Sequence, residues 1–301
     1  RLDNQQGVGA LDARREIAER YRIPEGVRVL LAAVDVQANR FEDAVWGYGQ
    51  GRERWLVDRY SISQTADGDP LRPAALREHW DELHRVILAT YKLEGGLEQR
   101  IYRVAVDIGG YHDRHQGADS TRRAYEWWRA LRPQRLHHRV QPVKGERTRR
   151  AKAIQLSYPD STARSDRHAG SRGDVPVLMI NTDKLKDSAH ADLQRDTPGP
   201  GYVHLPDWLS KPHMDELTTE ARDIKGHWAP ARGKRNETWD LLIYCDALWH
   251  QLGGERVQWD RPPAWLKEGE ANAEVITREQ RKTLQTSTKP TRARLPGRVR
   301  F

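Results

Sequence analysis

The first patterned part of the chain consists of apolar runs that predict strands. In residues 28–37, RVLLAAVDVQ, six apolar residues stand in unbroken succession before Asp35. A run without polar alternation is typical of a strand that is buried on both faces of a sheet. Strand-like runs at 41–49 and 53–60 follow, and the GYGQGR segment between them predicts a hairpin turn. We therefore expect the fold to begin as a meander of three strands.

Later residues alternate between helical and strand patterns. Leu76, Trp80, Leu83 and Ile87 recur at spacings of 4, 3 and 4, which predicts a helix over 71–91. The remaining predicted segments are strands at 101–107, 138–145 and 175–181, and helices at 118–131, at 183–194, around Met214, Leu217, Ala221 and Ile224, and from 235 onward. A strand meander followed by alternating helices and strands predicts an α/β fold with a mixed sheet flanked by helices.

Two acids lie at the ends of predicted buried strands, where side chains from neighbouring strands can meet. Asp35 and Asp107 each lie at the end of a buried-strand run. If the two strands are parallel neighbours, both carboxylates emerge at the same edge of the sheet, where ligand sites of such sheets lie. An aspartate that ends a strand is also a common turn starter, so a purely local role remains the alternative for each.

A third acid, Asp240, lies in the first turn of the last predicted helix. It falls on one stripe with Glu237, Tyr244 and Leu248, so it faces the sheet when the apolar residues of the stripe do. Asn236 precedes this helix and is expected to cap it. The alternative is that Asp240 only interacts favourably with the helix dipole.

Three carboxylates that converge on one point repel one another unless cations lie between them. Carboxylate oxygens suit hard cations such as Mg²⁺ or Mn²⁺. Two such ions, about 4 Å apart, activate a water molecule and stabilise the leaving oxygen of a phosphodiester. We therefore expect Asp35, Asp107 and Asp240 to bind two divalent ions and to carry phosphodiester hydrolysis.

Charge and composition indicate a basic C-terminal segment and speak against disulfide-linked, cysteine-zinc and membrane-spanning proteins. The formal net charge is +8, and the segment from Arg278 onward holds eight basic residues and one acid. Such a basic segment either binds nucleic acid or is a solvated end. The single cysteine, Cys245, excludes an internal disulfide and speaks against a cysteine-based zinc site. No stretch is long and apolar enough to predict a transmembrane helix.

Several sequence blocks together resemble a known family. The segment YRIPEGVRVLLAAVDVQANRFEDAVWGYGQGRERWLVDR is similar to the start of the nuclease domain of the lambda-like large terminase subunit of tailed phages, and VAVDIGG, QPVKG and RNETWDLLIYCDAL resemble its later motifs in the same order. The resemblance extends over about residues 21–252. Departures from the family pattern include Ala33, where a glycine is common, and the large Trp239 beside the third acid.

The resemblance implies an RNase H-like fold and a metal-dependent endonuclease that cuts concatemeric viral DNA. The three catalytic acids carry over onto Asp35, Asp107 and Asp240. Glu237 matches an acid one turn earlier, as an additional metal ligand or a supporting group. Lys144 of the PVKG block is expected to contact the scissile strand, and Arg235 is a further candidate for substrate binding.

The resemblance also implies partners and a domain layout. Its family carries an ATPase motor, acts with a portal and a small terminase subunit in the host cell cytoplasm, and binds double-stranded DNA rather than a membrane. No GxxxxGK followed by Ser or Thr occurs in the chain, so no motor is expected within it. We expect residues 1–27 to be a linker from that motor, 28–255 to be the nuclease domain, and 256–301 to be a basic, flexible tail.

Two other functions compete with this interpretation. One is another RNase H-like nuclease, such as a junction resolvase or a transposase, although the wide gap between Asp107 and Asp240 and the order of the blocks favour a terminase. The other is a non-catalytic module that binds DNA or a portal, in which the acids are structural and the basic tail binds the partner.

Overall fold

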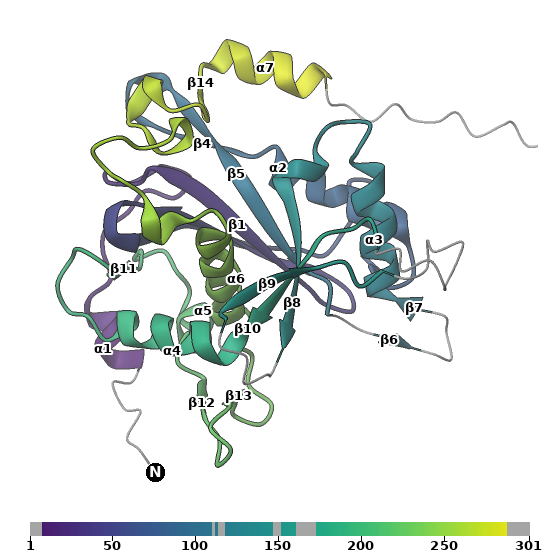
Figure 1. The fold of residues 1–301 in the computed structure, drawn as a ribbon, viewed down its shortest axis with the longest axis horizontal. Helices are drawn as coiled ribbons and strands as arrows, with labels where there is room; N and C mark the ends of the chain where they lie inside the picture. The colour runs from purple at the N-terminus through teal and green to yellow at the C-terminus, as the bar shows by residue number, and fades with distance from the viewer. Residues whose placement is uncertain (1–7, 110–111, 114–117, 147–151, 161–172, 288–301) are drawn as a thin grey trace, which may run out of the picture.

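A large mixed sheet forms the centre of the computed structural model, which describes residues 8–109, 112–113, 118–146, 152–160 and 173–287 (Figure 1). The main strand order is β11-β3-β2-β1-β5-β8-β10-β9, and β4 and β14 add to the start of β5. The strands of this sheet are β1 Val29–Val36, β2 Phe41–Tyr48, β3 Arg54–Ile62, β4 Thr90–Lys92, β5 Glu98–Asp107, β8 Val140–Glu146, β9 Ile154–Ser157, β10 Val177–Asn181, β11 Val203–His204 and β14 Val275–Ile276.

The directions of the strands confirm the expected mixed sheet. Strands β1, β2 and β3 pair as an antiparallel meander. Strand β5 then pairs parallel to β1 on the other side, β8 pairs parallel to β5, and β10 parallel to β8. The described part of the chain also has two small hairpins, β6 His112–Asp113 with β7 Ala118–Asp119 and β12 Glu220–Arg222 with β13 Trp228–Pro230.

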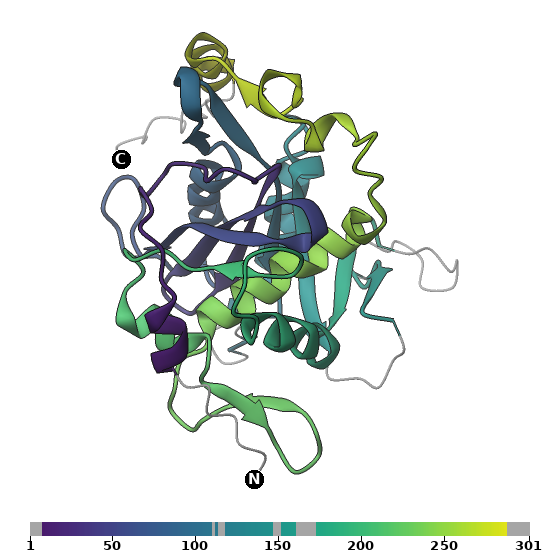
Figure 2. The same cartoon turned by 90° about the vertical axis from the view of Figure 1, so that its left-hand side faces the viewer.

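Helices cover both faces of the sheet. The described helices are α1 Val8–Ala13, α2 His84–Ile87, α3 Ser120–Ala130, α4 Thr182–Leu193, α5 Lys211–Glu216, α6 Glu237–Gln251 and α7 Arg278–Ser287. Figures 1 and 2 show α4, α5 and α6 on one face and α2 and α3 on the other. This confirms the predicted sheet flanked by helices.

The side chains of β1 alternate between these two layers. Leu31 and Ala33 belong to the apolar cluster beneath α6, and Ala32 and Val34 belong to the cluster beneath α2 and α3. Because both faces are covered, every residue from Val29 to Val34 is fully buried. The unbroken apolar run in the sequence is the consequence of this two-sided burial.

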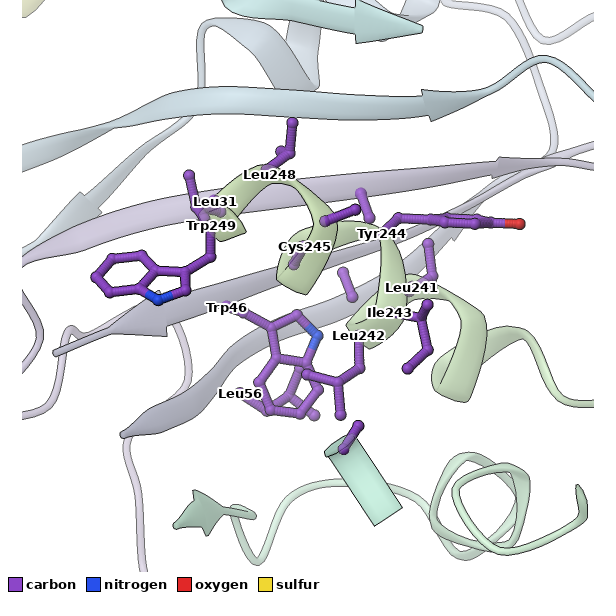
Figure 3. Close-up of a cluster of buried hydrophobic side chains, with 14 of the residues drawn as sticks. Leu31, Trp46, Leu56, Leu241, Leu242, Ile243, Tyr244, Cys245, Leu248 and Trp249 are labelled. Carbon is purple, nitrogen blue, oxygen red and sulfur yellow. The ribbon is translucent and has the colours of Figure 1, made fainter. Parts of the chain in front are cut away.

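Helix α6 lies directly against the middle of the sheet (Figure 3). Its apolar residues pack on Leu31, Trp46 and Leu56 of the first three strands. Near its end, Trp249 stacks on Tyr48 with 5.2 Å between the ring centroids. Burial of this many large side chains, at about 25 cal/mol per Å² of apolar area, fixes the position of the helix on the sheet.

Two predicted helices differ from the structure. The segment 71–91 forms a 3-10 helix at Arg77–Leu83 and a single α-helical turn, α2, before strand β4 begins at Thr90. The predicted helix through Met214 and Ile224 ends at Glu216 as α5, and Ile224 lies exposed in the β12–β13 hairpin. In both segments the spacing predicted some of the buried positions. The type of element was wrong, because short turns and strand pairing outweigh helical propensity there.

The segments at the two ends of the chain have their own contacts. In the N-terminal segment, Glu16 donates its backbone N–H to the carbonyl of Leu205, and Arg20 pairs with Asp58 at 2.9 Å. The prediction of a flexible tail from residue 256 is wrong for residues 256–276, which pack on the body and end in strand β14, paired with β5. Residues 288–301 lie outside the described residues, and the linker and tail roles stay predictions.

Within the described residues, no helix is long and apolar enough to cross a membrane. The longest of them, α6, has 15 residues and carries acids in its first turn.

A buried acid on β2 holds the charged groups beside the sheet edge in place. Glu42 is 1% exposed and accepts hydrogen bonds from Arg59, Ser61, Arg40 and Arg235. Burial alone would raise the pKa of Glu42, but the hydrogen bonds from Ser61 and Arg40 and the charge of Arg59 lower this pKa to about 2. The ionised form of Glu42 therefore stabilises the fold.

We predict that Glu42→Gln flattens the dependence of stability on pH between about pH 5 and about pH 2. Because the folded pKa lies below the ordinary value of 4.5, the ionised carboxylate contributes fully above that value, and its contribution disappears as the pH falls through about 2. The shift corresponds to at most about 3 kcal/mol. Urea denaturation at stepped pH measures the effect, with the exposed Glu19→Gln as control; identical slopes for wild type and Glu42→Gln would contradict it.

Candidate metal centre

The register of two parallel strands brings two acids to one point of the sheet edge. Val34 of β1 lies beside Val106 of β5, so the next residues, Asp35 and Asp107, are neighbours at the carboxyl ends of the strands. Ala33 and Ala105 precede them by two residues and belong to the cluster beneath α6. Since side chains alternate along a strand, both carboxylates lie on the α6 face.

Helix α6 brings the third acid to the same place. Tyr244, one turn after Asp240, donates its hydroxyl hydrogen to Oδ2 of Asp107 at 3.2 Å. The charge of Asp240 acts on both strand acids and raises the pKa of Asp35 and of Asp107. Asp240 on α6 therefore lies close enough to Asp35 and Asp107 for its charge to act on both.

Burial and neighbouring negative charge raise the pKa of the two strand acids. Burial raises the pKa of Asp35 well above its ordinary value, and the neighbouring charges of Asp107 and Asp240 raise it further. Burial also raises the pKa of Asp107 to about 6, although the Gly109 amide hydrogen bond acts in the opposite direction. Because like charges at short range oppose ionisation, a cation at this point would lower the free energy of the cluster.

The hydrogen-bond partners of the acids are unequal. Oδ2 of Asp35 accepts a hydrogen bond from the neutral Gln37 amide at 2.6 Å, and Oδ1 of Asp107 accepts one from the backbone N–H of Gly109 at 2.8 Å. No Lys or Arg within the described ranges forms an ion pair with either acid. The carboxylate of Asp240, by contrast, is bound at both oxygens.

Two residues whose contacts with Asp240 the sequence did not reveal lie beside it. Lys186 of α4 places its Nζ 2.7 Å from Oδ1 of Asp240 and also binds Glu220 of β12. Asn236 donates Nδ2 to Oδ2 of Asp240 at 2.8 Å and to Glu220 at 2.6 Å. The predicted cap is wrong in this respect: Asn236 precedes α6, but its side chain makes no capping hydrogen bond because it is engaged by these two acids.

Glu237 and Arg235 lie next to the cluster and bind each other. Nε of Arg235 is 3.0 Å from Oε2 of Glu237, and Nη2 of Arg40 is 3.2 Å from Oε1 of the same acid. The charge of Glu237 still raises the pKa of Asp35, so the acid is close to the centre. In this arrangement Glu237 has two cationic partners, and its role as a metal ligand and that of Arg235 in substrate binding stay predictions.

Lys144 lies on the next strand along the sheet edge. It is exposed on β8, and Val143 before it pairs with Asp107. Its charge lowers the pKa of Asp107, in opposition to the larger effect of burial. An exposed ammonium group beside a buried carboxylate is suitably placed to meet an anionic ligand.

The donor chemistry of the cluster fits divalent cations, but the side chains are not arranged as a completed site. Within the described part of the chain, no three His, Cys, Asp or Glu side chains are grouped so that they could hold one ion. The adjacent Asp35 and Asp107 offer uncompensated carboxylate oxygens, which suit Mg²⁺ or Mn²⁺. The third acid is already bound to Lys186.

Comparisons with known proteins give the context of this cluster. The family described as "Terminase large subunit gpA, endonuclease domain" matches residues 4–259. The large terminase subunit of Escherichia phage lambda is 28% identical over 238 residues, and that of Enterobacteria phage P21 is 27% identical over 242 residues. These matches cover 74% and 75% of this chain but 32% and 33% of the relatives, so the chain spans about a third of their length.

Among solved structures, the chain is similar to the large terminase (g2p) nuclease domain from the bacteriophage SPP1, a structure with bound Mn. The sequence identity is 10% and the TM-score is 0.35, with 79% of this chain and 96% of that chain covered.

We predict that Asp35→Asn stabilises the chain in the presence of EDTA at about pH 8. Because the folded pKa of Asp35 is raised, its ionised form opposes folding above the unfolded pKa, and the neutral amide removes that cost. The gain should be smaller near pH 4, where the unfolded carboxyl is itself half protonated, and it should vanish below that pH. Urea denaturation at both pH values measures it.

The matched control is Asp246→Asn, at a buried acid that has a cationic partner. Asp246 binds Arg54 at 2.5 Å and Tyr48 at 2.7 Å, so its substitution should destabilise the chain by about 3 kcal/mol. Equal losses of stability in both variants would mean that Asp35 is compensated like an ordinary buried acid.

Proposed function

The chain belongs to the endonuclease-domain family of the terminase large subunit gpA, and from this membership we propose that it is a divalent-metal-dependent endodeoxyribonuclease that cuts concatemeric double-stranded DNA during viral packaging. The observation that carries the proposal is the register that sets Asp35 beside Asp107 at the carboxyl ends of β1 and β5, beneath the helix α6 that carries Asp240. Buried carboxylates that raise one another's pKa are frequent at functional sites.

In the proposed mechanism Asp35, Asp107 and Asp240 would hold two Mg²⁺ or Mn²⁺ ions. Such ions would supply activation of a water molecule and neutralisation of the charge that develops on the phosphodiester. Asp35 and Asp107 provide adjacent oxygens from rigid strands, and the Tyr244 hydroxyl orients one oxygen of Asp107. Asp240 would add a third carboxylate, from α6.

The groups around the acids would orient the DNA strand. The exposed Lys144 would meet a phosphate next to the scissile bond, since its ammonium group stands beside Asp107 at the sheet edge. Arg235, whose side chain is 52% exposed, would contact a neighbouring phosphate while Glu237 keeps its guanidinium group in position.

The proposed partners follow from the family rather than from contacts in the structure. They are double-stranded DNA, an ATPase motor in the same full-length polypeptide, a portal and a small terminase subunit, in the host cell cytoplasm during virion assembly.

We predict that the purified chain cuts supercoiled plasmid with Mn²⁺ or Mg²⁺ and not with EDTA. Asp35→Ala, Asp107→Ala and Asp240→Ala should each reduce the rate at least about a hundredfold, because each removes a carboxylate from the centre. The exposed Asp260→Ala, at a side chain that is 76% accessible, is the matched control and should cut like the wild type. Gel analysis of nicked and linear plasmid measures the rates.

Each other outcome has a distinct meaning. Cutting that survives the loss of Asp35 and Asp240 would contradict the assignment of the acids. Cutting confined to branched DNA would indicate a resolvase. No cutting, together with a melting temperature that Mn²⁺ does not change, would favour a non-catalytic DNA- or portal-binding module, because an ion that binds only the folded state must raise that temperature.

We predict that Lys144→Ala weakens DNA binding. It should also reduce the slope of log affinity against log salt concentration by about 1, because one phosphate contact is lost. The affinity of the chain for Mn²⁺ should change far less than its affinity for DNA. Fluorescence anisotropy with a labelled duplex at several salt concentrations measures both effects, and Lys211→Ala, at a side chain that is 75% exposed, serves as control. If the salt slope does not change, Lys144 does not contact the DNA.

A further inference from the structure

A lysine is buried between two acids at the edge of the centre. Lys186 is 6% exposed, and its Nζ lies 2.7 Å from Oδ1 of Asp240 and 2.7 Å and 2.8 Å from the two carboxylate oxygens of Glu220. Asn236 bridges the same two acids from the other side. The proposed reaction gives neither Lys186 nor Glu220 a role, although burying three charges together is costly unless they are paired.

The position of this lysine distinguishes Asp240 from the other two acids. Asp35 and Asp107 have neutral or backbone hydrogen-bond partners, whereas Asp240 has an ammonium group bound directly to its carboxylate. An ammonium group and a metal ion compete for the same carboxylate lone pairs. A cation that binds Asp240 must therefore displace Lys186 from Oδ1 or share the carboxylate with it.

Glu220 makes such a displacement feasible. It contacts the Lys186 ammonium group through both carboxylate oxygens, so the lysine keeps a charged partner when Asp240 is released. The three elements involved are packed together: α4 contacts α6 and also β13, the partner strand of β12. The ammonium group is thus already fully engaged by Glu220 and stays paired when its contact with Asp240 is lost.

We infer that Lys186 is a built-in counter-cation of Asp240 that sets the affinity of the divalent-cation position to which Asp240 contributes. The inference rests on the proposed function, because it assumes that the acids bind ions. It makes the two ion positions unequal: the position at Asp35 and Asp107 fills first, and the position at Asp240 fills more weakly, in competition with Lys186. Lys186 is a positioning residue in this arrangement and touches no substrate.

The test is a titration of the full chain with Mn²⁺, followed by calorimetry and by electron paramagnetic resonance of the free ion. The wild type should bind one ion tightly and a second ion weakly. Lys186→Met should tighten the second ion by about tenfold or more and leave the first nearly unchanged, because one positive charge is removed beside Asp240. Lys184→Met, on the exposed side of the same helix, is the matched control and should bind both ions like the wild type.

A second variant changes the balance in the opposite direction. Glu220→Gln leaves Asp240 as the only carboxylate that Lys186 contacts in these ion pairs, so it should weaken the second ion by a similar factor. Lys186→Arg keeps the positive charge and should stay near the wild type. The opposite signs of Lys186→Met and Glu220→Gln keep the inference testable even if one variant folds poorly, which circular dichroism in EDTA would reveal.

The outcomes separate this inference from the proposed function. If the wild type binds Mn²⁺ but Lys186→Met leaves the second affinity unchanged or abolishes it, the counter-cation role is wrong; in the second case the lysine is needed to hold Asp240 in place. If the wild type binds no Mn²⁺ and Asp35→Ala behaves in the same way, the metal-dependent function itself fails.

Discussion

The parallel pairing of β1 with β5 is the constraint on which the rest of the structure depends. Both strands are buried between two helical layers, so their register is fixed by apolar packing on each face. The same register decides where the acids lie, since Asp35 and Asp107 follow Ala33 and Ala105 by two residues. A slip of one residue in either strand would turn its acid to the other layer and place an apolar side chain at the centre.

Asp240 faces the strand acids only if α6 has one orientation about its own axis. Buried polar contacts in the first turn and in the second half of α6 fix this orientation. In its first turn, the Thr238 hydroxyl and backbone N–H both bind Glu216. In its second half, Asp246 binds Arg54 and Tyr48 in the core. Such buried pairs add little net stability, but each is costly to break, so together they select one orientation of the helix. Asp240 lies between these two contacts along α6.

The sequence predicted those parts of the site that local patterns determine. Asp35 and Asp107 could be predicted because an acid at the end of a buried apolar run needs a partner, and Asp240 because helical spacing placed it with Tyr244. Lys186 could not be predicted in this way, since its partners on α6 and β12 are distant in the sequence and a lysine in a polar helix looks like a solvated residue. Only the packing of α4 on α6 reveals that it is buried.

The prediction of one helix over 71–91 was wrong because apolar spacing does not determine the type of helix. Trp80, Leu83 and Ile87 are buried, as their spacing predicted. The spacing of three to four residues is satisfied equally by a 3-10 helix followed by a single α-helical turn, so the pattern determines which side chains face the core and not the hydrogen-bond type. Apolar periodicity therefore predicts burial more securely than it predicts the element that achieves it.

The distribution of charge around the centre has a physical consequence for its chemistry. The arginines nearest to it are already matched: Arg59 and Arg40 bind Glu42, and Arg235 binds Glu237. These pairs give the neighbouring acids Glu42 and Glu237 cationic partners. Asp35 has a neutral partner in Gln37, and the charge of Lys144 offsets only part of the rise in the pKa of Asp107 that burial causes. The proposed divalent cation would bring more positive charge to these two carboxylates than a single side chain can.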